Sequence, residues 1–325
     1  MTEHGRTPWL PILVLALLLV LVVVLVPKQL SVPVTAVIAE TFAPPVPTAT
    51  VIFGGDMMFD RAVRTLVARN EPDFIFGCIA NTLATADHVV ANLEGPITSL
   101  PSVSVGTTPE SPNNFRFTFP IETAARIAPY VDTVAVGNNH ALDWGFAGLA
   151  ENITHLEKAG VSYFGDAQSH TVHEEDIGGV PLSFIGYNEF DPVWWTEAQQ
   201  KTIEQVIQAR GSGRVPVVYT HWGDEYVPAT DRVKATGRSF IEAGAAMVIG
   251  SHPHVVQEHE YWQGKPIYYS LGNLIFDQYF SEEVQNGLLI SVTFTKDGVQ
   301  DITEIPIVIG TDRRPCLSTP GNPGE

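Results

Sequence analysis

Residues 246–254 read Ala246-Met247-Val248-Ile249-Gly250-Ser251-His252-Pro253-His254. The apolar run predicts a buried β-strand, and it leads directly into two histidines that are separated by one residue. Alternate side chains of a strand point to one side, so both imidazoles point together if the extended backbone continues past Gly250. Pro253 favours that continuation because proline disfavours helix. The pair therefore indicates a metal site, with a solvated loop as the alternative for so short a motif.

The composition bounds the class of protein. The chain has 325 residues, of which 45% are hydrophobic, enough for a sizeable core. Its formal net charge of -18, from 36 Asp+Glu against 18 Lys+Arg, excludes a basic groove for nucleic acid. Cys78 and Cys316 form no Cys-x-x-Cys motif, and the sequence leaves open whether they pair.

The N-terminal part predicts a membrane anchor. Residues 9–26 carry no charge and are long enough to cross a bilayer. We expect a short cytoplasmic segment over 1–8, a transmembrane helix over 9–27, a linker over 28–48, a folded domain over 49–311 and a disordered tail over 312–325. The protein would then be a single-pass protein of the cell membrane with an extracytoplasmic domain. A cleaved signal peptide is the alternative, since residues 37–39 offer a small-residue cleavage site.

From Ala49 onward, Val/Ile-rich runs alternate with helical patterns, which predicts an α/β fold. The predicted strands are 50–54, 88–92, 131–136, 161–164, 181–186, 215–220, 246–250 and 266–270. The predicted helices are 61–69, 121–128, 146–159, 195–209 and 232–243. Residues 288–295 and 299–309 flank Asp297-Gly298 and predict a hairpin, so we expect a mixed sheet with antiparallel additions. Residues 95–120 are expected to form a long loop near the site.

Polar clusters follow many of the predicted strands. In open α/β sheets the carboxyl ends of the strands are where ligands bind. A set of Asp, Glu, Asn and His without cysteine suits zinc, manganese, iron or magnesium. Each residue alone has a structural explanation, such as a helix cap or a turn, but the combination favours a site. The candidates are Asp56, Glu94, Asn139, His140, Asp143, His221, Glu225, His252, His254 and Asn273.

Six of these clusters occur in a characteristic order. They are Gly55-Asp56-Met57-Met58, Asn92-Leu93-Glu94-Gly95-Pro96, Asn138-Asn139-His140-Ala141-Leu142-Asp143-Trp144-Gly145, His221-Trp222-Gly223-Asp224-Glu225-Tyr226, Gly250-Ser251-His252-Pro253-His254-Val255 and Tyr269-Ser270-Leu271-Gly272-Asn273-Leu274-Ile275-Phe276-Asp277. This series resembles the CapA family of poly-gamma-glutamate capsule synthesis proteins over residues 50–310. The family is similar in fold to calcineurin-like metallophosphoesterases. The resemblance therefore implies a two-sheet sandwich flanked by helices.

The resemblance also implies roles for individual residues. His221, His252 and Asn139 would hold one divalent ion, and Asp56 and His254 a second. His140, paired with Asp143, would protonate a leaving group. Two departures bear on the number of ions: Met58 stands where the pattern has a histidine ligand, and Glu94 where it has a bridging aspartate, so one or two ions are expected. Glu225 and Asn273 are candidate substrate contacts, and Glu225 could instead support His221.

Three functions stay open on the sequence. The first is a CapA-like protein that acts in synthesis or export of an anionic cell-surface polymer, for which a membrane polymer-synthase complex is a candidate partner. The second is a metal-dependent phosphoesterase acting on phosphoester substrates. The third is a non-catalytic scaffold of a membrane synthase.

Overall fold

The computed structural model describes residues 45–169, 171–194 and 196–318. The chain divides into two units, Met1–Val46 and Pro47–Glu325, and the fold below belongs to the second. The predicted cytoplasmic segment and transmembrane helix lie outside the described residues, as does most of the predicted linker. Among the helices of the described part, none is both long and apolar enough to cross a membrane.

The strands and helices alternate through most of this unit. The strands are β1 Ala49–Met57, β2 His88–Leu93, β3 Thr133–Ala135, β4 Ser162–Phe164, β5 His173–Ile177, β6 Val180–Asn188, β7 Val215–His221, β8 Met247–Ser251, β9 His259–Trp262, β10 Lys265–Tyr268, β11 Asn273–Ile275, β12 Asn286–Thr295, β13 Gly298–Ile309 and β14 Pro315–Leu317. The helices are α3 Arg61–Arg69, α4 Ala80–Leu83, α5 Thr123–Ile127, α6 Gly145–Ala159, α7 Ala198–Gly211 and α8 Asp231–Ala243, with 3-10 turns η1 Phe74–Phe76, η2 Pro112–Phe115 and η3 Glu283–Gln285.

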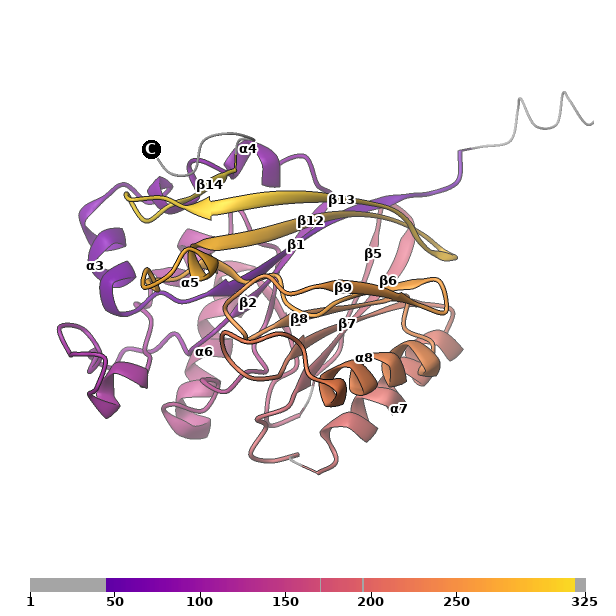
Figure 1. Cartoon of the computed structure of the whole chain (residues 1–325), viewed down its shortest axis with the longest axis horizontal. Coiled ribbons are helices and arrows are strands. Elements are labelled where there is room, and N and C mark those ends of the chain that lie inside the picture. The colour runs from indigo at the N-terminus through magenta and orange to yellow at the C-terminus, as the bar shows by residue number, and fades with distance from the viewer. Residues whose placement is uncertain (1–44, 170, 195, 319–325) are drawn as a thin grey trace, which may run out of the picture. The chain divides into compact units, whose positions relative to one another are not determined.

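The strands form two mixed sheets within the described residues (Figure 1). The first sheet has the order β14-β13-β12-β1-β2-β3-β4, with β11 pairing to the end of β1, and the second has the order β5-β6-β7-β8-β10-β9. In the first sheet β1 to β4 are parallel and β12, β13 and β14 are added antiparallel on the other side of β1. In the second sheet β6, β7, β8 and β10 are parallel, with antiparallel β5 and β9 at the two edges. The predicted α/β class and the antiparallel additions are therefore confirmed.

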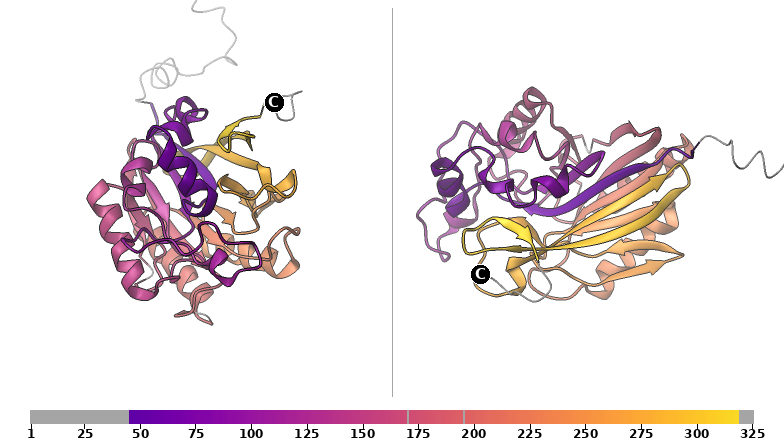
Figure 2. Two further views of the ribbon diagram at one scale, coloured as in Figure 1. Left: turned by 90° about the vertical axis from the view of Figure 1, so that its left-hand side faces the viewer. Right: turned by 90° about the horizontal axis from the view of Figure 1, so that it is seen from above.

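The two sheets pack face to face, and helices cover their outer faces (Figures 1 and 2). A core between the sheets joins Phe53 of β1 to Phe184 of β6 and Phe294 of β12. A second core lies between the first sheet and helices α3, α5 and α6. The third lies between the second sheet and helices α7 and α8. Burial of apolar side chains on both faces of the parallel strands explains why those strands read as nearly continuous apolar runs.

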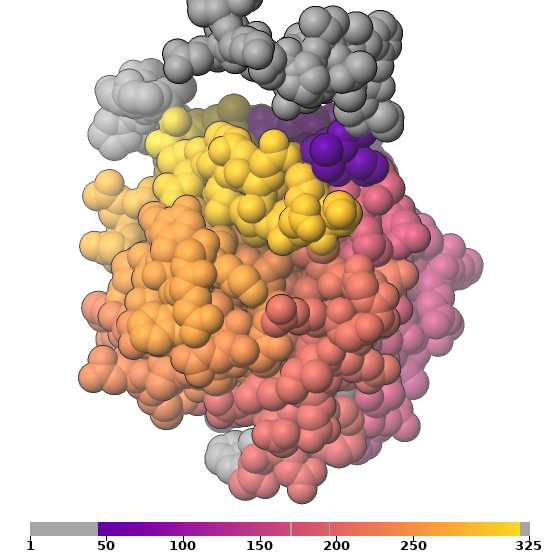
Figure 3. Space-filling view, turned by 90° about the vertical axis from the view of Figure 1, so that its right-hand side faces the viewer, coloured from indigo at the N-terminus to yellow at the C-terminus, as the bar shows by residue number. Residues whose placement is uncertain are grey.

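The predicted hairpin forms as β12 and β13, with Asp297-Gly298 at the turn. Gly298 has a φ of 123°, a conformation that favours glycine. Figure 3 faces the end of the molecule where this hairpin (yellow) lies beside the start of β1 (indigo). The sequence did not predict β5, β9, β11 or β14. These strands are short, at three to five residues, or carry alternating charged residues that give no strong periodic signal.

The C-terminal segment differs from its prediction. We expected residues 312–325 to be disordered, yet Pro315–Leu317 form β14, which pairs with the end of β13. A disulfide between Cys78 and Cys316 ties this strand to the segment after η1, across 238 residues of sequence. The covalent bond holds a strand that is too short to be stable on backbone pairing alone.

We expect the Cys78→Ser, Cys316→Ser double variant to be less stable than the wild type by roughly 2–4 kcal/mol, because the cross-link restricts the unfolded chain. Urea unfolding measures the difference. A reducing agent should lower the stability of the wild type to the level of the variant and leave the variant unchanged. Equal stability of oxidised wild type and variant would show that the cross-link does not stabilise the fold.

Candidate metal centre

The carboxyl ends of the central strands of both sheets meet at one edge of the molecule. Asp56 of β1 lies beside Asn92 of β2 and Asn273 of β11. In the second sheet, His221 of β7 lies beside Ser251 of β8. The backbone N–H of His252 donates to Asp56 Oδ2 at 3.1 Å and joins the two edges. The predicted convergence of the polar clusters at strand ends is what the structure shows.

Gly55 explains how Asp56 reaches this position. A Cβ at residue 55 would lie 1.8 Å from the carbonyl oxygen of Gly272, so only glycine allows the two backbones to approach. That approach lets the N–H of Asp56 donate to Gly272 O at 3.1 Å. The side chain of Asp56 is thereby held, fully buried, between the two sheets.

The histidine pair is held by a bend rather than by an extended strand. Strand β8 ends at Ser251, and the next residues turn away: His252 has a φ of 94° and His254 a φ of 57°. The expectation of continued extended geometry was therefore wrong, although the two rings still lie near each other, with centroids 5.9 Å apart. Left-handed backbone is unfavourable for histidine, and such strain is concentrated at functional sites.

The first group of ligand atoms contains His221, His252 and Glu94, all buried. His221 Nε2 lies 3.1 Å from His252 Nδ1 and 2.9 Å from Asn139 Oδ1. Ligands that share an ion at about 2.0–2.2 Å stand roughly 3.0–3.5 Å from one another. The arrangement of these atoms therefore suits a single divalent ion.

The second group contains Asp56, Glu94 and His254. His254 lies 3.5 Å from Asp56 Oδ2 through Nδ1 and 3.6 Å from Glu94 Oε1 through Nε2. A further group combines Glu225 with His252 and His254. Glu94 belongs to both buried groups, which places its carboxylate where two neighbouring ions would share a ligand.

The chemistry of the buried groups fits a cation. Glu94 is fully buried, and its Oε1 has no hydrogen-bond partner among the described residues. Burial, and then the neighbouring Asp56, raise the pKa of Glu94 well above its usual range. Burial lowers the pKa of His221, and it lowers the pKa of His252 to about 4, so both imidazoles are neutral ligands at pH 7. A divalent ion would offset the unfavourable burial of two carboxylates.

Three side chains that the sequence did not single out orient these ligands. Asn92 donates from Nδ2 to Asp56 Oδ1 at 2.7 Å, and Asn138 donates from Nδ2 to Asn92 Oδ1 at 3.1 Å. Ser251 Oγ lies 3.0 Å from His221 Nδ1, which leaves Nε2 of that ring directed at the site. Asn92 could have been found from its spacing, because residues two apart on a strand face the same side and Glu94 was already a candidate.

The two predicted substrate contacts lie in different environments. Asn273 is fully buried, and its Oδ1 lies 3.0 Å from His254 Nδ1 while its amide donates to Val284 O at 2.9 Å. It therefore positions His254. Glu225 is exposed, with an oxygen near His252 and His254. Met58 packs in the core beneath the first sheet, so no ligand comes from that position.

His140 and Asp143 form a pair at the border of the site. His140 Nδ1 lies 3.0 Å from Asp143 Oδ2, and its Nε2 lies 4.0 Å from Glu94 Oε1. Asp143 Oδ2 also accepts the backbone N–H of Phe117 at 2.6 Å, which fixes the carboxylate. A proton held on Nδ1 by Asp143 leaves Nε2, on the side of Glu94, free to accept or release a proton.

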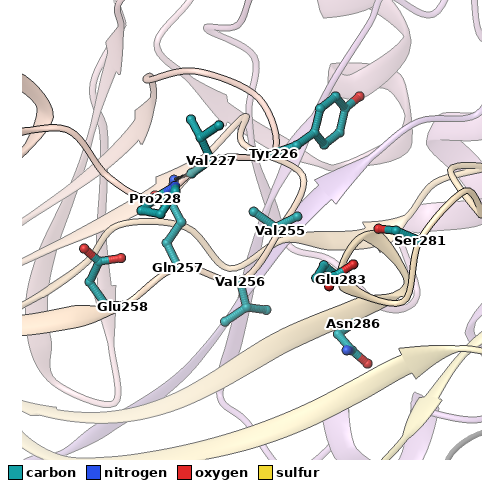
Figure 4. Close-up of a pocket in the computed structure, with 10 residues that line it drawn as sticks. All are labelled: Tyr226, Val227, Pro228, Val255, Val256, Gln257, Glu258, Ser281, Glu283 and Asn286. Atoms are coloured by element: carbon teal, nitrogen blue, oxygen red, sulfur yellow. Dashed lines mark hydrogen bonds between the residues drawn. The ribbon is translucent and has the colours of Figure 1, made fainter.

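The surface beside the site is hollowed on both sides of Tyr226. One hollow of about 430 Å³ is drawn in Figure 4, where Tyr226, Val255 and Ser281 are among the labelled residues that line it. A second hollow of about 430 Å³ is lined by Arg61 and Phe280 and also by Tyr226. The ring of Tyr226, which lines both hollows, lies 6.1 Å from that of His254, whereas the candidate ligands themselves line neither hollow.

The fold and the site together define a two-sheet α/β protein with a buried histidine–carboxylate centre that could hold a divalent ion. The chain belongs to the family described as bacterial capsule synthesis protein PGA_cap, which residues 50–278 match. The recognition made from the six sequence motifs is thereby confirmed.

Curated relatives agree with this membership. The chain is 25% identical over 280 residues to the capsule biosynthesis protein CapA of Bacillus anthracis, covering 80% of this chain and 67% of that protein. It is 26% identical over 282 residues to the PGA biosynthesis protein CapA of Bacillus subtilis, covering 79% of this chain and 70% of that protein. A probable polyglutamine synthesis accessory protein of Mycobacterium tuberculosis is 30% identical over a 185-residue match that covers 49% of this chain and 47% of that protein.

We expect His252→Ala and Glu94→Gln each to lower the divalent-metal content of the purified protein. The first change removes a ligand nitrogen, and the second keeps the shape of the side chain but removes its charge. Elemental analysis after dialysis against zinc or manganese measures the content. His259→Ala is the matched control, because His259 is exposed and pairs with Glu304 away from the site. Wild-type protein that retains no more metal than His252→Ala would contradict the assignment.

Proposed function

We propose that the protein acts in the synthesis or export of an anionic cell-surface polymer of the poly-gamma-glutamate type, through a divalent-metal site. The observation that carries the proposal is the Glu94 carboxylate, which is buried, lacks a hydrogen-bond partner for one oxygen among the described residues, and belongs to two groups of potential ligands. Family membership and the names of the two Bacillus relatives support the polymer.

The side chains at the site have separable roles in this proposal. A divalent ion at the centre would polarise a carbonyl or phosphoryl oxygen of the substrate. His140 holds or releases a proton at Nε2, and Asp143 keeps its ring oriented. Glu225, exposed beside His252 and His254, is placed either to complete the ligand set or to contact the substrate.

The shape of the surface favours an extended substrate. The two hollows are open to solvent and share Tyr226, whose ring lies 6.1 Å from that of His254, so a chain of repeating units that lay across both would pass near the candidate centre. Tyr226 and Phe280 are exposed there, at 41% and 66%, and can pack against the apolar parts of such a chain. The acidic surface of the protein would repel a polyanion, and bound metal would counter that repulsion at the site.

A membrane-anchored, extracytoplasmic location is part of the proposal. The disulfide between Cys78 and Cys316 supports it, because disulfides persist in oxidising compartments and are rare in the cytosol. The uncharged residues 9–26 support the anchor.

In intact cells, neither Cys78 nor Cys316 should react with a maleimide until a reductant is added. The reason is that both thiols of an extracytoplasmic domain would be joined in the disulfide. The Cys316→Ser variant serves as the control, since its single thiol at Cys78 should react without reduction if it is accessible after denaturation. Free thiols at both positions in freshly denatured wild type would contradict the location.

A metal-dependent phosphoesterase is the second candidate, favoured by the His140–Asp143 pair beside the ligand groups. It predicts turnover of generic phosphomonoesters or phosphodiesters by the purified chain with added manganese or zinc. A non-catalytic scaffold predicts no turnover of any kind. Each of these functions is compatible with the same fold, so measurements of phosphoester turnover and polymer formation are needed to distinguish them.

We expect His140→Gln to lower polymer formation in a producing strain by about hundredfold or more, because general acid–base catalysis contributes roughly 10²–10⁴-fold. Asp143→Asn should lower it as well, since the ring loses its orienting carboxylate. Isolation and weighing of the polymer measures both. His155→Gln is the matched control, as His155 pairs with Glu151 along helix α6.

The outcomes of this experiment separate the candidates. Normal polymer from the His140→Gln strain would show that His140 is not the acid. Loss of polymer on deletion of the gene, without loss in the His140→Gln and His252→Ala strains, would favour the scaffold. Phosphoester turnover with no change in polymer would favour the phosphoesterase.

A further inference from the structure

A second cluster of potential ligands lies away from the metal centre, where the two sheets meet near the start of β2. It consists of His88, the first residue of β2, with His173 and Glu175 on β5. One ligand atom from each of the three lies within 4.8 Å of the others. Glu94 lies six residues after His88, just past the end of β2 and about 20 Å away at the rise of a strand, so the two clusters are separate.

Strand alternation directs two of these side chains inward. Along β5, His173, Glu175 and Ile177 are partly or fully buried, whereas Glu174 and Asp176 between them are exposed. Arg214 pairs with the outward-facing Glu174 and Asp176. The Glu175 carboxylate, whose side chain is 42% exposed, therefore lies beside both imidazoles, 2.9 Å from His173 Nε2 and 3.8 Å from His88 Nδ1.

His88 comes from the other sheet and is oriented by its neighbours. Its ring is buried, stacks on Phe184 at 5.6 Å, and places Nε2 2.8 Å from Thr133 Oγ1. When Nε2 donates its proton to Thr133, Nδ1 keeps a lone pair. Nδ1 lies 3.8 Å from Glu175 Oε2, which is longer than a hydrogen bond. A hydrogen bond behind a ligand ring is how metal-binding histidines are commonly fixed.

The distances from Glu175 to the two imidazoles are compatible with a shared ion. His173 Nε2 lies 2.9 Å from Glu175 Oε2. Ligands around a tetrahedral zinc ion stand roughly 3.3 Å apart, and the two observed separations lie on either side of that value. Burial lowers the pKa of His88, which keeps the imidazole neutral as a ligand must be.

We propose that His88, His173 and Glu175 bind one divalent transition-metal ion of the zinc type, distinct from the centre at Glu94. Two imidazoles and one carboxylate are a donor set that zinc accepts, with a fourth position open to water on the partly exposed side. The ion joins β5, an edge strand paired only with β6 in the described sheets, to β2 of the opposite sheet. Its role is to clamp the two sheets together at this edge.

Zinc titration of the full chain, purified in detergent, tests the site. We expect Glu175→Gln to lose one bound zinc per chain, measured by equilibrium dialysis with elemental analysis, and His173→Gln to do the same. Glu174→Gln is the matched control, because its side chain is the adjacent outward carboxylate of the same strand. Circular dichroism verifies that each variant is folded. If His173→Gln does not fold, Glu175→Gln still tests the site, because that change is isosteric and lies at a partly exposed position.

Two further variants separate a metal site from a hydrogen-bonded pair without an ion. Thr133→Val should weaken zinc binding at this site by roughly 10- to 100-fold, as loss of a group behind a metal ligand does. The His252→Ala variant should retain one zinc ion, and the His252→Ala, Glu175→Gln double variant should retain none. Added zinc should raise the melting temperature of the single variant but not that of the double variant. Equal zinc content in wild type, Glu174→Gln and Glu175→Gln would overturn the proposal, even if the metal centre at Glu94 binds as expected.

Discussion

The hydrogen bond from the backbone of His252 to the carboxylate of Asp56 is the interaction on which the site depends. It connects the end of one sheet to the end of the other, across residues that are 196 positions apart in sequence. Both partners are buried, so the bond is unscreened and its loss would leave a buried carboxylate without that donor. The same bond holds His252 in left-handed backbone, which would otherwise be unfavourable.

Burial gives the centre its chemical character. Asp56 and Glu94 lie side by side in the interior, and Asn92 donates to the first of them. Low dielectric makes two adjacent buried carboxylates costly, and a cation held by them would offset that cost. The asparagines behind the ligands, and Ser251 behind His221, are positioned to keep the ligand atoms in place when no ion compensates them. A preorganised ligand set of this kind reduces the entropy lost on metal binding.

Patterns with a strong period could be predicted from the sequence, and those set by long-range contact could not. The apolar runs predicted the central strands of both sheets, and Asp297-Gly298 predicted the hairpin of β12 and β13. The ligand histidines were found because they follow strands, but the bend at His252 was not, since it results from contact with Asp56 on the other sheet. Strand β14 was missed because it is three residues long and is held by Cys316, whose partner the sequence left open. Asn273 was taken for a substrate contact because its burial behind His254 depends on β11 joining β1.

The disulfide has a consequence for the integrity of the chain. Cys78 and Cys316 are 238 positions apart, and the span between them includes most of both sheets and every candidate ligand of the centre except Asp56. A protease that cuts once inside this span, for instance in the loop over residues 95–120, therefore releases no fragment, because the two pieces remain joined through sulfur. After a single cleavage the covalent ring would therefore keep both pieces together, and the packed sheets could remain folded around the cut.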